Sequence, residues 1–256
     1  MFSSYPFLSD FRRRFSGSSA TAEASTELID RYMTSTGIIE IREGLFRGHH
    51  ARLLFADGAL QSAAALEKGQ QHLLLFPYLR CFSWPFSSGR SIESTLLIGG
   101  GGFAWPRNFL HTRQEGRIDV VEVSSVMIDV SRRYFFLDEL LASPRFTLFE
   151  KDGFSYLLSC PYRYDLILCD AFTGKKENSS LISGDGIPLL KAHLTENGIF
   201  MSNFITSLTG LHSHPGHSAK KLFESGFRNT SLIQADDTRD PSQLQNCILM
   251  ASDGEL

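Results

Sequence analysis

The sequence predicts an α/β protein: a seven-stranded sheet with helices on both faces, preceded by a small N-terminal β-hairpin unit. From about residue 95 onward, short apolar runs alternate with longer segments whose apolar residues recur at helical spacing, which is typical of consecutive β-α units in a parallel sheet. Two further apolar runs, at residues 230–233 and 247–251, follow the last helical segment. They predict a closing antiparallel pair at one edge of that sheet.

Composition narrows the class of protein. The 256 residues, 42% hydrophobic and 21% charged, suit a globular chain with one substantial core. A formal net charge of -3 provides no basic surface for phosphates, and no apolar stretch approaches the roughly 20 residues of a membrane span. Neither nucleic acid nor membrane is therefore an expected partner. The four cysteines lack CxxC spacing, which favours a cytoplasmic protein with reduced thiols.

The N-terminal part is expected to hold a polar, flexible head, residues 1–26, and a hairpin and helix unit, residues 27–90. The head carries three arginines among Ser, Ala and Thr, a composition that overlaps with organelle transit peptides, so a targeting segment stays an alternative. Gly37–Ile41 and Ala51–Phe55 predict the hairpin. Leu66–Phe82 repeats apolar residues at helical spacing and predicts a helix. The Ser-rich stretch 83–94 predicts a linker.

Residues 91–256 are expected to form the cofactor-binding domain. Its five parallel strands are predicted at Thr95–Ile98, Ile118–Val123, Phe146–Phe149, Asp165–Cys169 and Ile199–Phe204. Its helices are predicted at Trp105–Thr112, Val126–Tyr134, Phe154–Leu158, Gly186–Leu194 and Ser218–Ser225. The closing pair is predicted at Thr230–Ile233 and Cys247–Ala251.

A glycine-rich turn and an acid mark the first two strand ends. The first strand runs directly into Gly99–Gly102, and a helix follows within a few residues. Backbone without Cβ lets a ligand approach, and a helix N-terminus offers free N–H groups. Glu122 comes about 20 residues later, where doubly wound folds place an acid on a ribose diol. The structural alternatives are a tight connection for the glycines and a strand-end ion pair for Glu122.

Two more acids follow the third and fourth strands. Asp152-Gly153 comes after the third, and Asp170 comes directly after four apolar residues of the fourth. Ligands of open α/β sheets bind beyond the carboxyl ends of the strands, so these residues are expected on one rim. Helix capping is the structural alternative for both acids. The whole pattern predicts a nucleotide-type cofactor site within residues 92–204.

The motifs, taken in order, resemble the spermidine synthase-like family over about residues 37–251. The resemblance rests on ADGALQS, LLIGGGG followed by PR, DVVEV, KDGFSYL, YDLILCDAF, LTENGIFMSNFI and QNCILMA. It implies a class I methyltransferase-like (Rossmann-like) fold. It also implies a polyamine-biosynthesis transferase that moves an alkyl group, aminopropyl or methyl, from S-adenosylmethionine or decarboxylated S-adenosylmethionine to an amine or other nucleophile. A homodimer is implied as well.

The resemblance implies roles for single residues. The expected cofactor-binding residues are Gln61, Gly99, Gly100, Gly101, Glu122, Asp152 and Gly153. In that assignment the glycines line the sulfonium side, Glu122 holds the ribose hydroxyls and Asp152 lies by the adenine. Gln61 reaches the cofactor from the N-terminal unit. Asp170 is the expected catalytic residue, which faces the attacking amine as general base or anchor.

Two departures from the family pattern remove expected carboxylates, the first facing the ammonium group of an aminopropyl donor and the second lying near the attacking amine. Gly102 stands where the synthases carry an acid after the third glycine, and Phe172 occupies the region of a second acid near the amine. Each lost ion pair in a partly buried site costs on the order of 1 to 3 kcal/mol. The departures therefore argue against tight binding of a doubly charged polyamine.

Several functions stay open at this point. They are an aminopropyltransferase, an S-adenosylmethionine-dependent methyltransferase proper, and a non-catalytic binding or scaffold protein that keeps the fold. A nicotinamide dinucleotide enzyme is a weaker alternative, because Asp152-Gly153 and the closing edge pair count against it. The histidines of HSHPGH, residues 212–217, match no zinc spacing, so no metal is expected.

Overall fold

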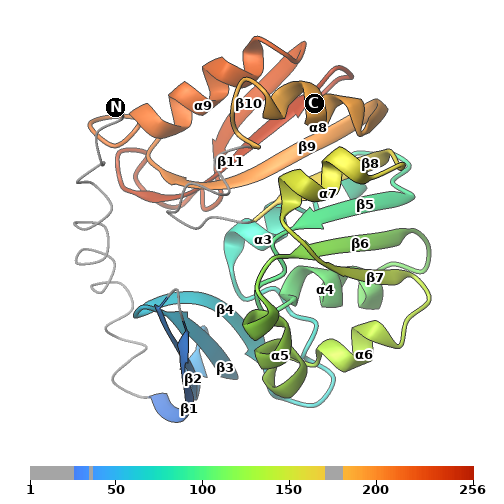
Figure 1. Cartoon of the computed structure of the whole chain (residues 1–256). Helices are drawn as coiled ribbons and strands as arrows, with labels where there is room; N and C mark the ends of the chain where they lie inside the picture. Colours follow the sequence, from blue (N-terminus) through green and yellow to red (C-terminus); the bar gives the residue numbers. More distant parts are fainter. Residues whose placement is uncertain (1–25, 35–36, 171–180) are drawn as a thin grey trace. The chain divides into compact units, whose positions relative to one another are not determined.

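The computed structural model describes residues 26–34, 37–170 and 181–256 (Figure 1). They fall into two compact units. The first holds the described part of residues 1–75 together with Gly101–His111 and Val126–Asp138, and the second holds Phe76–Gly100, Thr112–Ser125 and the described part of residues 139–256. The expected head, residues 1–26, lies outside the described residues except for Thr26. The domain boundaries at 26/27 and 90/91 stay predictions.

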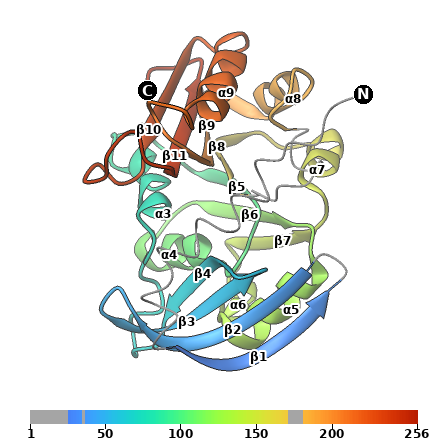
Figure 2. The same ribbon diagram turned by 90° about the vertical axis from the view of Figure 1, so that its left-hand side faces the viewer.

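The first unit contains a four-stranded antiparallel sheet in the order β1-β2-β3-β4 (Figure 2). Its strands are β1 (Thr26–Thr34), β2 (Gly37–Phe46), β3 (His49–Ala56) and β4 (Ala59–Ala65). Both Arg47-Gly48 and Asp57-Gly58 have positive φ at each residue, the geometry of the two-residue turns that match the twist of paired strands. The predicted hairpin is β2 with β3, and the sequence prediction missed the flanking strands.

One apolar cluster holds the first unit together. Ile39, Ile41 and Leu54 of the sheet pack with Val130 and Tyr134 of α5 (Ser125–Tyr134). Burying side chains of this size stabilises the unit by about 1.5 to 3 kcal/mol each. The helix therefore gives the sheet the apolar partner that a two-layer unit needs.

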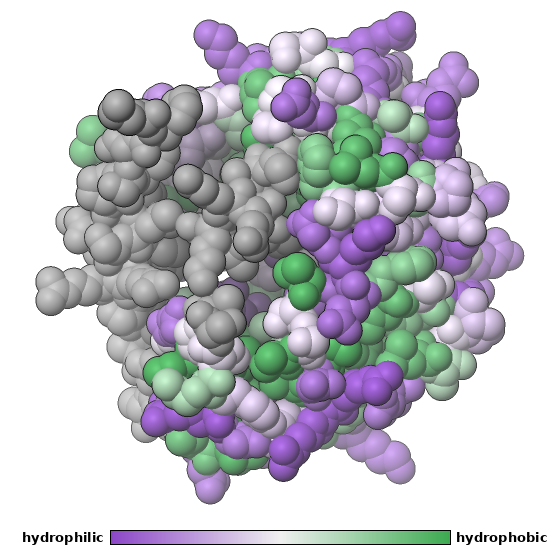
Figure 3. All heavy atoms as spheres, in the orientation of Figure 1, coloured by the Kyte–Doolittle hydropathy of each residue, from purple (hydrophilic) through white to green (hydrophobic). Residues whose placement is uncertain are grey.

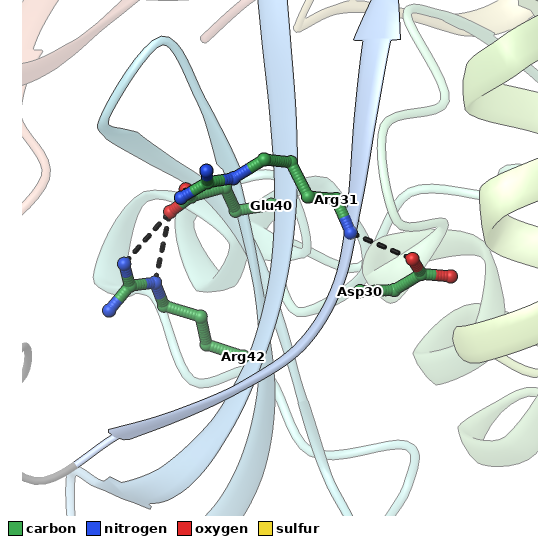
Figure 4. A network of polar contacts seen from close by, with 4 residues as sticks. All are labelled: Asp30, Arg31, Glu40 and Arg42. Carbon is green, nitrogen blue, oxygen red and sulfur yellow. Dashed lines mark hydrogen bonds and ion pairs between the residues drawn. The ribbon is translucent and has the colours of Figure 1, made fainter.

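Polar side chains occupy the β1-β2 ladder. Glu40 accepts hydrogen bonds from Arg42 Nε at 3.0 Å and from Arg31 Nε at 2.9 Å, while Arg31 N–H donates to Asp30 at 2.8 Å (Figure 4). Arg31 and Glu40 are cross-strand partners, which places opposite charges face to face. Because Arg31 is exposed, this network contributes little to stability.

The helix predicted over Leu66–Phe82 is wrong. Residues 66–76 form turns and irregular backbone, and only α3 (Pro77–Cys81) is helical, followed by the 3-10 turn η1 (Trp84–Phe86). Gly69 takes a φ of +78°, which a helix does not allow. Pro77 has no N–H and holds Phe76 in an extended conformation, so a helix begins at the proline rather than running through it.

The second unit is built on a mixed seven-stranded sheet in the order β10-β11-β9-β8-β5-β6-β7. The strands are β5 (Ser94–Ile98), β6 (Arg117–Glu122), β7 (Phe146–Glu150), β8 (Tyr164–Cys169), β9 (Leu194–Thr206), β10 (Asn229–Gln234) and β11 (Gln245–Ser252). The first five run parallel, and β11 pairs antiparallel with both β9 and β10. The predicted seven-stranded α/β fold with its closing antiparallel pair is confirmed.

The remaining predicted helices are present. They are α4 (Ala104–Thr112), α5, α7 (Gly153–Ser159), α8 (Gly186–Ala192) and α9 (His214–Glu224), while the short α6 (Leu137–Leu141) was not predicted. However, α9 begins at His214 rather than at the predicted Ser218, and Leu194, the predicted end of α8, is the first residue of β9. In the second unit, Phe200 of β9 stacks on Phe223 of α9 with ring centroids 5.1 Å apart. Among the described residues, no helix is long and apolar enough to cross a membrane.

Polar and apolar residues are interspersed on the face drawn in Figure 3. Exposed large apolar side chains include Met33 and Leu45 in the first unit and Leu158 and Leu211 in the second. Single exposed apolar residues are ordinary on a protein surface. They point to no ligand by themselves.

Candidate functional site

The glycine turn and Glu122 are joined by hydrogen bonds in the second unit. Gly99 has a φ of +93°, a conformation that favours glycine, and its N–H donates to Val121 O at 2.8 Å. Glu122 Oε2 accepts from Gly100 N–H at 2.8 Å, and Oε1 accepts from Ser124 N–H at 2.9 Å. The carboxylate therefore fixes the shape of the turn. An ionised carboxylate has about four acceptor positions, so these two bonds are compatible with a bound diol.

Replacing Glu122 with Gln is expected to lower the free energy of unfolding by about 1 to 3 kcal/mol. The side chain is only 8% exposed, and the Gln NH2 group cannot accept the N–H that one carboxylate oxygen now receives. Denaturant unfolding measures the change. Glu150→Gln is the matched control, because Glu150 pairs with Glu122 at the same level of β7 and is exposed. Equal losses of unfolding free energy in Glu122→Gln and Glu150→Gln would show that the Glu122 carboxylate does not stabilise the glycine turn.

The other two glycines belong to the first unit. Gly101 has a φ of +51°, and its carbonyl accepts from Ser131 Oγ at 2.8 Å. A Cβ on Gly102 would lie 2.4 Å from Ser62 Oγ and 2.8 Å from Ser62 Cβ. A side chain at residue 102 therefore has no room beside Ser62, which is buried on β4. The departure at Gly102 depends on a residue 40 positions earlier in the chain, which the sequence pattern did not reveal.

Gln61 precedes Ser62 on β4, and its side chain is exposed. An exposed glutamine can donate to and accept from a ligand. Its contact with a cofactor stays a prediction.

Asp152 and Gly153 form the start of α7. Asp152 is the N-cap residue, and its Oδ1 accepts from Ser155 N–H at 2.8 Å, which is the capping that was the structural alternative. A Cβ on Gly153 would lie 2.5 Å from Ile98 Cγ2. Glycine is therefore needed where the helix passes the end of β5. The place of both residues beside an adenine stays a prediction.

Asp170 lies beyond the carboxyl end of β8 and is held by three groups. Its N–H donates to Ile98 O at 2.9 Å. Its Oδ2 accepts from the Tyr78 hydroxyl at 3.0 Å, and its Oδ1 accepts from Asn203 Nδ2 at 3.1 Å. Because β5, β6 and β8 are parallel, Asp170 shares one sheet edge with Gly99 and Glu122, as the sequence predicted.

Tyr78 and Asn203 were not among the predicted site residues. Tyr78 fell inside the helix wrongly predicted over residues 66–82, and the structure places it on α3. Asn203 lies within the apolar run Ile199–Phe204 that predicts a strand, and it is a buried polar residue on β9 with 6% exposure. A polar residue within a buried strand was the available signal, because such a group needs a partner.

Burial raises the pKa of Asp170 from 3.8 to about 7, although the hydrogen bonds from Asn203 and Tyr78 favour the ionised form. Burial and the neighbouring charge of Asp170 raise the pKa of Tyr78 well above its ordinary value, so the phenol stays a neutral donor. A carboxyl group that ionises near neutral pH is suited to take a proton from a reacting group.

Two further predictions about the site concern Phe172 and metal ligands. Phe172 lies outside the described residues. Within the described ranges, no group of three or more metal-ligating side chains occurs.

Comparison with known sequences identifies a family domain. The model of the spermine/spermidine synthase domain matches residues 83–232. The polyamine aminopropyltransferase of Alkaliphilus metalliredigens is 29% identical over 119 residues, 46% of this chain and 42% of that protein. The enzyme of the same name from Vibrio vulnificus is 25% identical over 173 residues, 66% of this chain and 56% of that protein. The chain thus spans about half the length of these relatives.

Comparison with solved structures identifies the same fold. A probable spermidine synthase from Corynebacterium glutamicum superposes with a TM-score of 0.73 at 20% identity, over 90% of this chain and 82% of that one. Spermidine synthase from Thermotoga maritima gives a TM-score of 0.67 at 18% identity, over 89% and 73%. Human methyltransferase-like protein 13 gives 0.52 at 19% identity, over 69% and 77%. The likeness to the two spermidine synthase structures covers nearly the whole chain, and the likeness to the methyltransferase covers about two thirds of it.

Proposed function

Because this chain belongs to the spermine/spermidine synthase domain family, we propose that it transfers an aminopropyl group from decarboxylated S-adenosylmethionine to an amine. The single observation that carries the proposal is the Asp170 carboxyl. It is held at the carboxyl edge of the sheet by Tyr78 and Asn203, and its pKa lies at about 7. A group of this kind can hold an attacking amine and accept its proton at neutral pH.

The proposed reaction is a direct displacement. The lone pair of the uncharged amine attacks the aminopropyl carbon that is bound to the sulfonium sulfur. The carbon–nitrogen bond forms as the carbon–sulfur bond breaks, and the sulfur leaves as a neutral thioether. The proton lost by the amine passes to Asp170. Since the donor supplies the leaving group, the protein contributes alignment and a proton acceptor.

The donor would be held by the predicted cofactor residues, Gln61, Gly99, Gly100, Gly101, Glu122, Asp152 and Gly153. Glu122 supports this assignment because its buried carboxylate ends β6 next to Gly100. That is the position from which an acid can accept two ribose hydroxyls. For the acceptor we propose an amine with a single charged end, because the segment Asp170-Ala171-Phe172-Thr173 provides one carboxylate for the amine.

Calorimetric titration with the two donors tests this proposal first. Decarboxylated S-adenosylmethionine is expected to bind at least about tenfold more tightly than S-adenosylmethionine, a difference of about 1.4 kcal/mol. Transfer to putrescine, spermidine and simple monoamines is then followed by release of the thioether product. Glu122→Gln should weaken donor binding, whereas Glu150→Gln should not. A folded protein that binds neither donor would leave a non-catalytic scaffold as the better description.

Methyl transfer is the second candidate, and Gly102 is the observation that favours it. Ser62 lies where a carboxylate at residue 102 would have to pass, so this position offers no acid for the ammonium group of an aminopropyl donor. Tighter binding of S-adenosylmethionine in the same titration would select this candidate. A cytoplasmic location stays a prediction from the composition, and a homodimer stays a prediction of the family resemblance.

A further inference from the structure

Two asparagines form a chain of hydrogen bonds that ends on Asp170. Asn246 Nδ2 donates to Asn203 Oδ1 at 3.0 Å, and Asn203 Nδ2 donates to Asp170 Oδ1 at 3.1 Å. Asn246 lies on β11 and Asn203 on the neighbouring β9, two positions apart in the antiparallel register. Diagonal neighbours of this kind share a face of the sheet and lie within reach of each other. The chain thus links β11 to the end of β8.

The chemistry of the amide gives this chain a direction. An ionised carboxylate can only accept, so Asn203 has to turn its NH2 group toward Asp170 and its carbonyl toward Asn246. Asn246 donates to that carbonyl and so favours this orientation. If Asn203 turned over, its carbonyl would face the carboxylate and its NH2 group would face the NH2 group of Asn246. Both contacts would be lost.

We propose that Asn246 is a positioning residue that keeps the NH2 group of Asn203 directed at Asp170 and thereby keeps the carboxylate ionised and oriented toward the attacking amine. The kinetic part of this inference rests on the proposed function. The effect on the ionisation of Asp170 does not, because it follows from the hydrogen-bond chain alone.

The groups around Asp170 come from four elements. Tyr78 approaches from α3, and the Ile98 carbonyl accepts the Asp170 N–H from β5. Asn203 approaches from β9, with Asn246 of β11 behind it. Tyr78 is the titratable member of this set, and its raised pKa keeps it neutral. Neutral donors therefore oppose the effect of burial, and weakening one of them favours protonated Asp170.

The test compares Asn246→Leu, Asn203→Leu and the double variant in the full chain. The ionisation of Asp170 is followed by the carboxyl carbon signal in NMR, assigned by its loss in Asp170→Asn. Asn246→Leu is expected to raise the pKa of Asp170 by about half a unit to one unit. In the Asn203→Leu background, Asn246→Leu should produce no further shift, because Asn246 acts through Asn203.

The pH profile of transfer gives the second measurement. Asn246→Leu should lower the rate about three- to tenfold at pH 6 and leave it near wild type at pH 9, where the carboxylate is ionised in both proteins. A merely structural loss would lower the rate at all pH values. If no transfer is detected in wild type, the proposed function fails, while the NMR shift still tests the hydrogen-bond chain.

Two further variants keep the test decisive. Asn246→Ala removes the donor without adding a charge or a larger side chain, so it should raise the pKa of Asp170 even if the Leu variant folds poorly. Gln234→Leu is the matched control, because it removes a half-buried amide that lies outside the chain of hydrogen bonds to Asp170. The Gln234 side chain on β10 donates to the carbonyls of Asp236 and Arg239. An unchanged pKa of Asp170 in both Asn246→Leu and Asn246→Ala, or equal shifts with and without Asn203, would overturn the proposal.

Discussion

Replacing Asp170 with asparagine is expected to slow group transfer by about 10² to 10⁴ and to leave donor affinity close to wild type. Asparagine has nearly the same shape and can still accept from Asn203, while the Tyr78 hydroxyl can turn to accept from the new NH2 group. The variant lacks only the ability to take a proton and to carry charge. Single-turnover rates with saturating donor measure the effect, and calorimetry measures donor binding.

The same variant has a characteristic pH dependence. In wild type, transfer should rise with pH through about 7, because burial places the pKa of Asp170 there and the ionised form accepts the proton. The residual rate of Asp170→Asn should lack this inflection. Asp185→Asn, which removes an exposed acid just before α8, is the control and should keep the wild-type profile. A wild-type profile in Asp170→Asn would exclude the carboxyl as the proton acceptor.

The free energy of unfolding of wild type should fall as the pH rises, whereas the transfer rate should rise. The folded state raises the pKa of Asp170 from 3.8 to about 7. Protonated Asp170 therefore makes its full contribution to the free energy of unfolding below pH 3.8, and this contribution is lost as the pH rises to about 7. Asp170→Asn stays neutral throughout. Above pH 7 its free energy of unfolding should therefore exceed that of wild type by about 1 to 2 kcal/mol, after allowance for the partial exposure of the side chain. Near pH 4 the two proteins should differ little in stability.

Replacing Gly102 with Asp is expected to destabilise the protein by about 3 kcal/mol or more. The new Cβ would lie 2.4 Å from Ser62 Oγ, 2.8 Å from Ser62 Cβ and 3.2 Å from the Phe135 ring. These atoms are buried, so either the strand or the glycine turn has to move. Denaturant unfolding of the single variant measures the cost.

A double variant identifies Ser62 as the cause. Ser62→Gly removes both of the closest atoms, so Gly102→Asp should cost at least about 1 kcal/mol less in that background than in wild type. Gly184→Asp is the control, because a Cβ there meets nothing within 4 Å, and it should change stability by less than about 0.5 kcal/mol. Additive effects of Ser62→Gly and Gly102→Asp would show that Ser62 does not exclude a side chain at residue 102.

The sheet of the second unit could be predicted because its signal is local. β5, β6, β7 and β8 are short apolar runs separated by segments of helical period, and each is found within one residue of its predicted start. Apolar spacing over Leu66–Phe82 predicted a helix that does not form, because Gly69 and Pro77 interrupt it. Backbone conformation at these two residues decided the outcome, since φ at Gly69 is +78° and Pro77 begins its own helix.

The sequence by itself determined which strands end in a glycine or an acid. Because these strands are parallel, Gly99, Glu122 and Asp170 then had to share one edge of the sheet. Only the tertiary structure decided what each group contacts. Tyr78, Asn203 and Asn246 come from three elements that are distant in the chain, and Ser62 excludes a side chain at Gly102. The physical reason is that periodicity reports which face of an element is buried, whereas a hydrogen bond or a close contact depends on the packing of elements against one another.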